Sequence, residues 1–277
     1  MKTILLLSAK EVREGLRNLW VVAATGLLAA LALTLAFLGS APTGTVGTGA
    51  LDVVVISLAS LTIFIVPLIA LLISHDAIVG EIERGTMTLL LSYPVRRRQV
   101  LFGKFMGHLA ILAFATCVGY GLAAVALLAT GKAMIGAGSW AAFVTMTASS
   151  VLLGAVFVAI GYLISALVAD RATAGGIAIG IWLVFVVLYD MALLGLLVAD
   201  QGRAVGGGTL DALLLFNPTD AYRLLNLAGS GDIAAASGMA GTIQTAALAP
   251  AALLAALAAW VVAPMALAAL AFSRREL

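Results

Sequence analysis

Hydrophobic residues gather along this chain into six long runs separated by shorter polar segments. Each run exceeds the roughly 18 residues that a helix needs to cross the hydrocarbon core of a bilayer. The runs are apolar on every side, whereas a membrane β-barrel would show strands of about ten residues with alternating polarity. The pattern therefore predicts an all-α membrane protein with six spanning helices in a single domain, 1–277. The runs extend over residues 19–39, 54–74, 105–130, 141–168, 174–198 and 247–271.

Charge is scarce and unevenly placed, and its placement predicts the orientation of the helices. Of the 277 residues, 63% are hydrophobic and 10% charged, so the surface is expected to face lipid rather than water. Because cytoplasmic loops are enriched in Lys and Arg, both termini are predicted to be cytoplasmic, with Lys132, Arg203 and Arg223 outside. The net charge of +2 then reflects orientation and gives no indication of nucleic-acid binding. The other twelve of the 15 basic residues lie inside in this topology: Lys2, Lys10, Arg13, Arg17, Arg84, Arg96, Arg97, Arg98, Lys104, Arg171, Arg274 and Arg275.

The first residues of the chain form an amphipathic segment ahead of the first span. Leu5, Val12 and Leu16 recur at helical spacing, while Lys10 falls on another face. Residues 2–18 are therefore predicted to be an elbow helix that lies in the headgroup layer. A solvated helical tail is the alternative interpretation.

The polar segment between the second and third runs concentrates charge in a chain that otherwise avoids it. Residues 76–91 are predicted to form a helix on the cytoplasmic side, which Pro94 ends. Three consecutive arginines, Arg96 to Arg98, then mark the headgroup boundary, although ordinary anchoring of the loop explains them equally well. A helix fixed in this way to two spans would act as a rigid lever. Its water-facing residues are expected to be Glu81, Glu83 and Arg84, and its bundle-facing residues Ile78, Ile82, Leu89 and Leu90.

Residue types that bind transition metals are few. Cys117 lies inside an apolar run without a second Cys or a nearby His–carboxylate cluster, and is interpreted as a small buried hydrophobe. No ladder of Met or Cys follows any span, as a soft copper ion would require. We therefore expect no metal site in this chain.

Two pairs of glycines have the small-xxx-small spacing that allows helices to approach closely in lipid. One pair is Gly103/Gly107 and the other is Gly176/Gly180, in the fifth run. Such pairs pack either within one chain or between subunits. The fifth span, with Gly176 and Gly180, is our candidate for a dimer seam.

A carboxylate inside the fifth run needs a compensating interaction, since burial in lipid is costly. Asp190 must be hydrated, paired or neutral. It either belongs to a cavity or gate, or lies near the outer interface, because the run ends some nine residues later.

The connection between the fifth and sixth spans, 199–246, is long for a membrane protein. Within it, residues 221–227 are predicted to form a helix capped by Thr219 or Asp220, after Asn217-Pro218. We expect two short helices on the outer surface, which seal a translocation route or meet an extracytoplasmic partner. A passive polar linker is the alternative.

The polar segment also carries a recognisable motif. The run Gly80-Glu81-x-Glu83-x-Gly85-Thr86, followed by Leu90-Leu91-Ser92-x-Pro94-Val95 and Gly103-Lys104, resembles the loop after the second span of ABC-2 type permeases. The six spans, the amphipathic N-terminal segment and the basic tail Arg274-Arg275 are similar to that family as well. The resemblance implies that 76–91 is a coupling helix. Its implied ATPase-coupling residues are Gly80, Glu81, Glu83, Arg84, Gly85 and Thr86.

A second motif is similar to a subset of the family. Asn217-Pro218-x-x-x-Tyr222-Arg223-Leu224-Leu225 resembles the permease subunits of transporters that assist copper-centre maturation of nitrous oxide reductase. The resemblance implies a homodimer in the bacterial inner membrane that binds two ATPase subunits, which carry the ATP and Mg. It also implies a periplasmic accessory protein on the outer face, with Asn217, Pro218, Tyr222 and Arg223 as candidate partner or gate residues.

ATP hydrolysis is expected in a separate subunit, because the chain has no phosphate-binding loop: Gly103-Lys104 lacks the upstream glycine of that motif. The chain is therefore predicted not to be an enzyme and to carry no cofactor. Three alternatives stay open. They are an exporter permease for a lipid, drug or polysaccharide, a membrane scaffold that only anchors a partner, and, least favoured, a secondary transporter.

Overall fold

The computed structural model describes residues 2–17, 19–38, 50–130, 137–200, 207–227 and 248–276, and every regular element in these ranges is a helix. The predicted all-α fold is therefore confirmed for the described part of the chain. The helices are α1 (Lys2–Leu16), α2 (Leu19–Leu38), α3 (Ala50–Ser74), α4 (Val79–Glu83), α5 (Thr86–Leu91), α6 (Arg97–Ala129), α7 (Ala137–Leu167), α8 (Arg171–Leu183), a π-helical turn (Val184–Leu188), α9 (Tyr189–Asp200), α10 (Gly207–Phe216), α11 (Pro218–Leu227) and α14 (Pro250–Arg274).

Within these described ranges, five helical stretches are long and apolar enough to cross a membrane. A sixth crossing is possible if the bent pair Thr3–Leu16 and Val21–Phe37, whose axes differ by 69°, counts as one span. All six predicted apolar runs thus fall on long helices, and the bend separates the amphipathic N-terminal segment from the first run. The five stretches are Val54–Glu83, Arg97–Ala129, Trp140–Leu167, Arg171–Asp200 and Pro250–Arg274.

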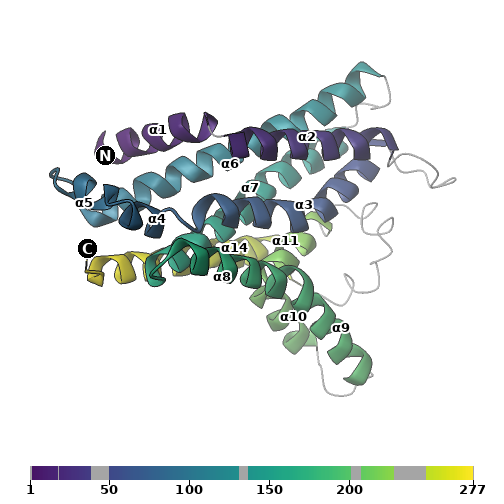
Figure 1. The fold of residues 1–277 in the computed structure, drawn as a ribbon. Helices are drawn as coiled ribbons and strands as arrows, with labels where there is room; N and C mark the ends of the chain where they lie inside the picture. The colour runs from purple at the N-terminus through teal and green to yellow at the C-terminus, as the bar shows by residue number, and fades with distance from the viewer. Residues whose placement is uncertain are drawn as a thin grey trace.

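The helices form a bundle with two distinct ends (Figure 1). Both chain termini lie at the same end as α4 and α5, while α9 and α10 diverge from the bundle at the other end. We call the first the inner end and the second the outer end, in keeping with the predicted distribution of basic residues.

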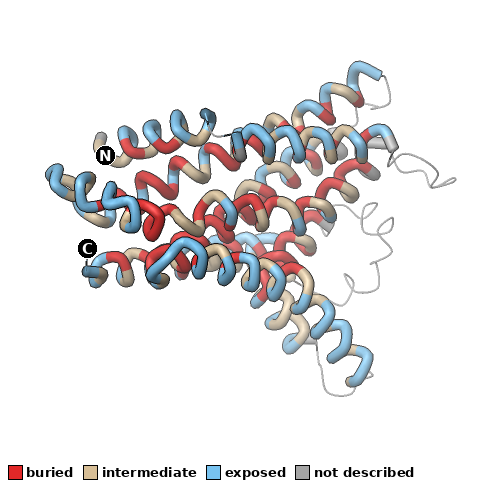
Figure 2. The backbone as a smooth tube through the Cα atoms, viewed as in Figure 1, coloured by how far each residue is buried: buried red, intermediate tan, exposed pale blue. Residues whose placement is uncertain are grey.

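Burial is concentrated on α7, which lies in the middle of the bundle (Figure 2). In the most apolar window of this helix 78% of residues are buried, against 6% in the window of the stretch Arg171–Asp200. The fifth span is therefore peripheral, and most of its side chains face away from the rest of the chain.

The two glycine pairs have different surroundings. At Gly103 an added Cβ would lie 2.7 Å from the Cβ of Leu7, and at Gly107 it would lie 2.5 Å from the Cβ of Glu11. This pair therefore lets α1 approach α6 within one chain. At Gly176 and Gly180 an added Cβ would meet no atom within 4 Å, so this pair faces open space.

Two predictions at the level of helices were wrong. The expected single helix 76–91 is two short helices, α4 and α5, separated by Gly85, whose φ of 71° is left-handed and ends a helix. Cys117 was expected to be buried, but it is exposed on the outside of α6. A small apolar thiol is compatible with a lipid-facing position as well as with a core.

Candidate functional site

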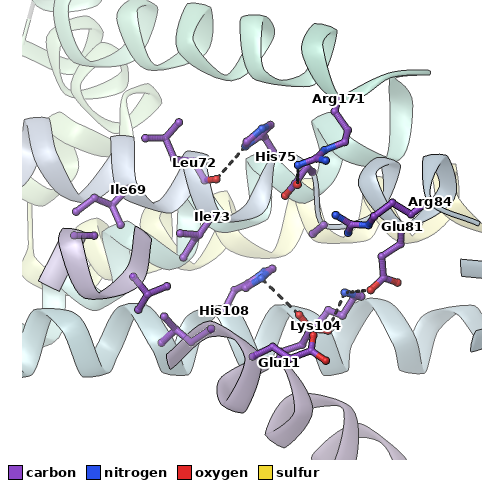
Figure 3. Close-up of a pocket in the computed structure, with 17 residues that line it drawn as sticks. Glu11, Ile69, Leu72, Ile73, His75, Glu81, Arg84, Lys104, His108 and Arg171 are labelled. Atoms are coloured by element: carbon purple, nitrogen blue, oxygen red, sulfur yellow. Dashed lines mark hydrogen bonds and ion pairs between the residues drawn. The ribbon is translucent and has the colours of Figure 1, made fainter. Parts of the chain in front are cut away.

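The inner end holds a buried group of charges that joins three helices (Figure 3). The ammonium of Lys104 in α6 lies 2.8 Å from a carboxylate oxygen of Glu11 in α1 and 2.8 Å from one of Glu81 in α4. All three residues are buried. Buried charges persist only when they are paired, so this cluster fixes the position of α4 relative to α1 and α6.

The position of Glu81 corrects the sequence analysis, which placed this residue in water beside Glu83 and Arg84. Glu81 is 9% exposed, whereas Glu83 and Arg84 are exposed as expected. Within a helix Glu81 and Glu83 lie on different faces, and Glu81 shares the bundle-facing side of Ile78, three residues earlier. Lys104 then supplies the cation that makes burial of a carboxylate possible.

The start of α4 is also held by α7 and α8. The hydroxyl oxygen of Ser165 in α7 accepts hydrogen bonds from the backbone N–H groups of Ile78 and Val79, at 2.9 and 3.0 Å. The carboxylate of Glu83 accepts a hydrogen bond of 2.8 Å from the backbone N–H of Arg171, at the start of α8. The predicted coupling segment is therefore attached directly to α6, α7 and α8, and to α1 through Lys104.

The helix α5 is attached more loosely and presents apolar side chains outward. Met87 is fully buried and anchors the helix. Leu89, predicted to face the bundle, is instead 67% exposed, and Tyr93 beyond the helix is 63% exposed. Thr86 is exposed as well. These side chains form a surface at the inner end, where water or another protein must cover them.

At the outer end the motif around Asn217 and Pro218 begins α11. The side-chain oxygen of Asn217 accepts a hydrogen bond of 3.1 Å from the backbone N–H of Thr219, so Asn217 caps the helix and Pro218 is its first residue. The sequence analysis assigned the cap to Thr219 or Asp220, two or three residues too late. Proline suits the first helical position because its missing N–H would be unpaired there in any case.

The same asparagine also contacts the fifth span. Its amide donates a hydrogen bond of 3.1 Å to the backbone carbonyl of Phe185, and the hydroxyl of Thr219 donates one of 3.2 Å to the same carbonyl. Phe185 lies in the π-helical turn Val184–Leu188, where the helical hydrogen-bond pattern is interrupted. The start of α11 therefore satisfies a carbonyl in the irregular part of the span.

Asp190 is paired, which is one of the three states the sequence allows. Its carboxylate lies 2.6 Å from the guanidinium of Arg223, which also lies 2.7 Å from the carboxylate of Asp220. One cation thus serves two acids. Burial raises the pKa of Asp220 to about 7, and the charge of Asp190 acts in the same direction, against the lowering effect of Arg223.

The location of α11 corrects a second prediction. A helix on the outer surface was expected, yet Asn217 and Tyr222 are completely buried, and the Tyr222 hydroxyl lies 3.0 Å from that of Ser150 in α7. The neighbouring helix α10 is bonded to α9, since the backbone carbonyl of Leu213 accepts a hydrogen bond from the hydroxyl of Tyr189. The rest of the predicted outer loop, 201–206 and 228–247, lies outside the described residues.

The sequence analysis did not identify three residues that hold α4 in place. They are Lys104 and Ser165, which contact it, and Glu11, which contacts Lys104. A signal for two of them exists: Glu11 is the one acidic residue of the elbow that faces the Gly103/Gly107 pair, and Lys104 lies between those glycines. No such signal marks Ser165. Among the described residues, no group of three or more His, Cys, Asp or Glu side chains could hold a metal ion.

Comparison with known proteins identifies the family of this chain. Residues 5–277 match the family described as ABC-2 family transporter protein. The chain is 45% identical to the "Probable ABC transporter permease protein NosY" of Pseudomonas aeruginosa over 277 residues, the full length of both. It is 48% identical over 225 residues to the protein of the same name from Stutzerimonas stutzeri, which is 80% of each chain. The chain belongs to the ABC-2 family of transporter proteins and is a membrane-embedded ABC transporter permease subunit.

Proposed function

We propose that this permease forms a homodimer that couples ATP hydrolysis by two separate ATPase subunits to work on the outer side of the membrane. The observation that carries the proposal is that α4 and α5 are attached to the bundle on one side and expose apolar side chains on the other. The side of α4 that faces the bundle is attached to it through Glu81 and Lys104. The opposite side of the segment, which faces away from the bundle, exposes Leu89 and Tyr93. Exposed apolar groups at a polar end favour contact with a soluble protein.

The attachments of α4 provide a route for movement. A displacement of α4 by a partner would act on α6 and α1 through Lys104, on α7 through Ser165 and on α8 through the backbone of Arg171. Because paired buried charges are costly to separate, these helices would move as one body with α4. The proposed ATPase contact also includes the exposed residues Glu83, Arg84, Gly85 and Thr86. Gly80 and Glu81 are buried behind them, where the segment meets the bundle.

The proposed work at the outer end involves α11. Its hydrogen bonds to Phe185 and its ion pair to Asp190 join it to the fifth span, which continues from α8 beside α4. A rotation of that span would therefore reach Asn217, Pro218, Tyr222 and Arg223, the proposed gate or accessory-protein residues. Dimer formation is proposed along the open face of the fifth span at Gly176 and Gly180.

The ATPase contact is testable by co-purification from bacterial membranes with a candidate ATPase subunit that is co-expressed with the permease. We expect Leu89→Asp to abolish recovery of the ATPase, because a carboxylate would replace an apolar contact. Thr130→Asp adds the same charge at the far end of α6 and is expected to retain wild-type recovery. Wild-type recovery with Leu89→Asp would remove α5 from the proposed contact.

We further propose that the transporter acts in copper-centre assembly of nitrous oxide reductase, at the inner membrane and with a periplasmic accessory protein. The support is the similarity to the two permeases named NosY. Expression of this chain in a Pseudomonas aeruginosa strain that lacks its NosY should restore copper-loaded, active reductase. Restored export of a lipid, drug or polysaccharide without active reductase would favour the exporter alternative, and rescue that survives inactivation of the ATPase would favour a scaffold.

A further inference from the structure

A cavity of about 560 Å³ opens at the inner end between α1, α2, α3, α4 and α6 (Figure 3). This volume lies within the range of about 300–1,000 Å³ that is typical of small-molecule sites. The cavity is distinct from the outward-facing surface of Leu89 and Tyr93, neither of which lines it.

The cavity is lined by both charged and apolar side chains, and the charged ones include Glu14 and the ion pair of Asp76 with Arg171. Arg84 and Glu81 lie at one end in Figure 3, and Ile69 and Ile73 lie toward the other. Ile111 follows Lys104 by two turns of α6, which places it about 10 Å deeper in the membrane. The cavity thus has the polarity of a phospholipid at the bilayer surface, with a polar group outside and an apolar portion inside.

The polar end contains one carboxylate oxygen and one guanidinium that have no partner in the described part of the chain. One carboxylate oxygen of Glu81, Oε2, is buried and has no hydrogen-bond partner, because only Oε1 contacts Lys104. Lys104 is shared between Glu81 and Glu11, and Glu11 also lies 4.0 Å from the more exposed Lys10, so Glu81 has no cation of its own. The guanidinium of Arg84 extends into the cavity in Figure 3 and makes no ion pair with the described residues.

We propose that the cavity binds the headgroup of an inner-leaflet phospholipid that carries a primary amine, as in phosphatidylethanolamine. The ammonium of the headgroup donates a hydrogen bond to the free oxygen of Glu81, and its phosphate accepts from Arg84. A buried carboxylate with one free oxygen and a free guanidinium together match a zwitterion better than an anion or a cation alone. The apolar start of the acyl chains lies against Ile69, Ile73 and Ile111.

This assignment goes beyond the proposed ATPase contact, because it places a lipid ligand on the side of α4 that faces the bundle. It also predicts a ranking of lipids. Phosphatidylcholine has a quaternary ammonium with no N–H to donate to Glu81, and phosphatidylglycerol has no cation. Both should bind less tightly than phosphatidylethanolamine.

The test is native mass spectrometry of the purified full-length permease in detergent, after titration with each of the three lipids in turn. We expect one phosphatidylethanolamine per chain to resist removal, with about tenfold weaker retention of the other two, as loss of a charge-assisted hydrogen bond implies. Equal retention of all three lipids would overturn the assignment. A further measurement adds soluble O-phosphoethanolamine to the permease with bound phosphatidylethanolamine. Displacement of the lipid at an equal concentration would mean that the apolar part of the cavity contributes nothing to binding, which would refute the lipid assignment.

Single substitutions test which residues form the proposed lipid site. Arg84→Gln changes an exposed side chain and is expected to weaken phosphatidylethanolamine retention about tenfold without loss of folding. Arg98→Gln removes an exposed charge at the same end that does not line the cavity, and should leave retention unchanged. Glu81→Gln should abolish the preference over phosphatidylcholine. Equal losses for Arg84→Gln and Arg98→Gln would show only general attraction of lipid to a basic surface, and would refute the proposal.

Discussion

The ammonium of Lys104 lies 2.8 Å from a carboxylate oxygen of Glu81, and both side chains are almost completely removed from solvent. Lys104 belongs to a membrane-spanning helix and Glu81 to the short helix at its inner end. Each charge makes burial of the other tolerable, since an isolated buried ion is strongly unfavourable. Their contact is therefore a condition for the observed position of α4.

Removal of Lys104 should destabilise the protein more than removal of an exposed lysine. Lys104→Met removes the cation that lies 2.8 Å from both Glu11 and Glu81 and leaves only the more exposed Lys10, 4.0 Å from Glu11. We expect a loss of about 3–5 kcal/mol in the free energy of unfolding, the usual cost of breaking a buried ion pair. Thermal unfolding in detergent, followed by tryptophan fluorescence, measures it.

The comparison variant is Lys10→Met, which removes a half-exposed lysine of α1 that lies 3.5 Å from Glu14 and 4.0 Å from Glu11. Exposed ion pairs contribute up to about 1 kcal/mol, so the loss should stay below that value. The triple variant Lys104→Met, Glu11→Gln, Glu81→Gln removes the charges together and should recover most of the lost stability. If the triple variant were as unstable as Lys104→Met, packing of the lysine stem rather than charge would explain the loss.

The start of α11 provides a prediction at the opposite end. Asn217→Ala removes the acceptor for the Thr219 N–H and the donor to the Phe185 carbonyl. We expect a loss of about 1–2 kcal/mol, at the upper end of values for helix caps, because the carbonyl also loses a partner. Chemical unfolding in mild detergent, with α-helical circular dichroism as the signal, measures it.

A graded series separates the two roles of Asn217. Asn217→Ser keeps an oxygen that can accept from the Thr219 N–H but has a shorter reach toward Phe185, so an intermediate loss is expected. Thr209→Ala, an exposed position on α10, should be neutral within about 0.5 kcal/mol. A serine variant as unstable as the alanine variant would mean that the contact with Phe185 outweighs the cap.

The difference between what the sequence predicts and what the structure contains follows from the range of the interactions. Apolar runs predict the long helices, because the bilayer sets their length and a run of some 20 residues is unambiguous. The N-terminal segment and the Gly103/Gly107 contact are also local signals, one in periodicity and one in spacing. Such features could be predicted within a few residues.

The burial of Glu81 and the burial of α11 could not be predicted in this way. Helical spacing places Glu81 on the face of Ile78, but the cation that makes its burial tolerable, Lys104, lies 23 positions along the chain. The helix α11 is polar enough for a surface. Its polar groups find partners in Ser150 and Phe185, which lie on separate spans, so tertiary contacts override the local pattern.

The open glycines of the fifth span provide a prediction about assembly. Gly176→Leu and Gly180→Leu should leave the stability of one chain unchanged, since nothing lies within 4 Å of the added side chain. If a second copy packs there, both variants should shift the protein from dimer to monomer, because close approach of the helices is lost. Size-exclusion chromatography with light scattering in detergent measures the mass.

Two further glycines complete that experiment. Gly121→Leu is the matched control, since this glycine of α6 also faces open space but lies on another helix, and its dimer fraction should equal that of the wild type. Gly107→Leu should instead destabilise the chain itself, because the Cβ would meet Glu11. Unchanged mass for Gly176→Leu and Gly180→Leu would exclude this face as the seam.

The acid group at the outer end predicts a dependence of stability on pH. Asp220 lies on α11, outside the spanning helices, and burial raises its pKa from the ordinary 3.8 to about 7. Below about pH 4 the carboxyl is protonated in both the folded and the unfolded protein. Between about pH 4 and 7 the folded protein holds a proton that the unfolded protein has released, so the contribution of this group to stability falls as pH rises.

The difference between the wild type and Asp220→Asn isolates this effect from other titrations. Asparagine cannot ionise, so the stability of the variant relative to the wild type should rise by a few kcal/mol from about pH 4 to 7, and then level off. The comparison requires unfolding curves of both proteins at several pH values. A relative stability that falls over this interval would mean that Arg223 stabilises the ionised carboxylate more than burial destabilises it. In that case Arg223 is fully shared between Asp190 and Asp220, and the outer cluster is a permanently charged triad rather than a pair with a neutral neighbour.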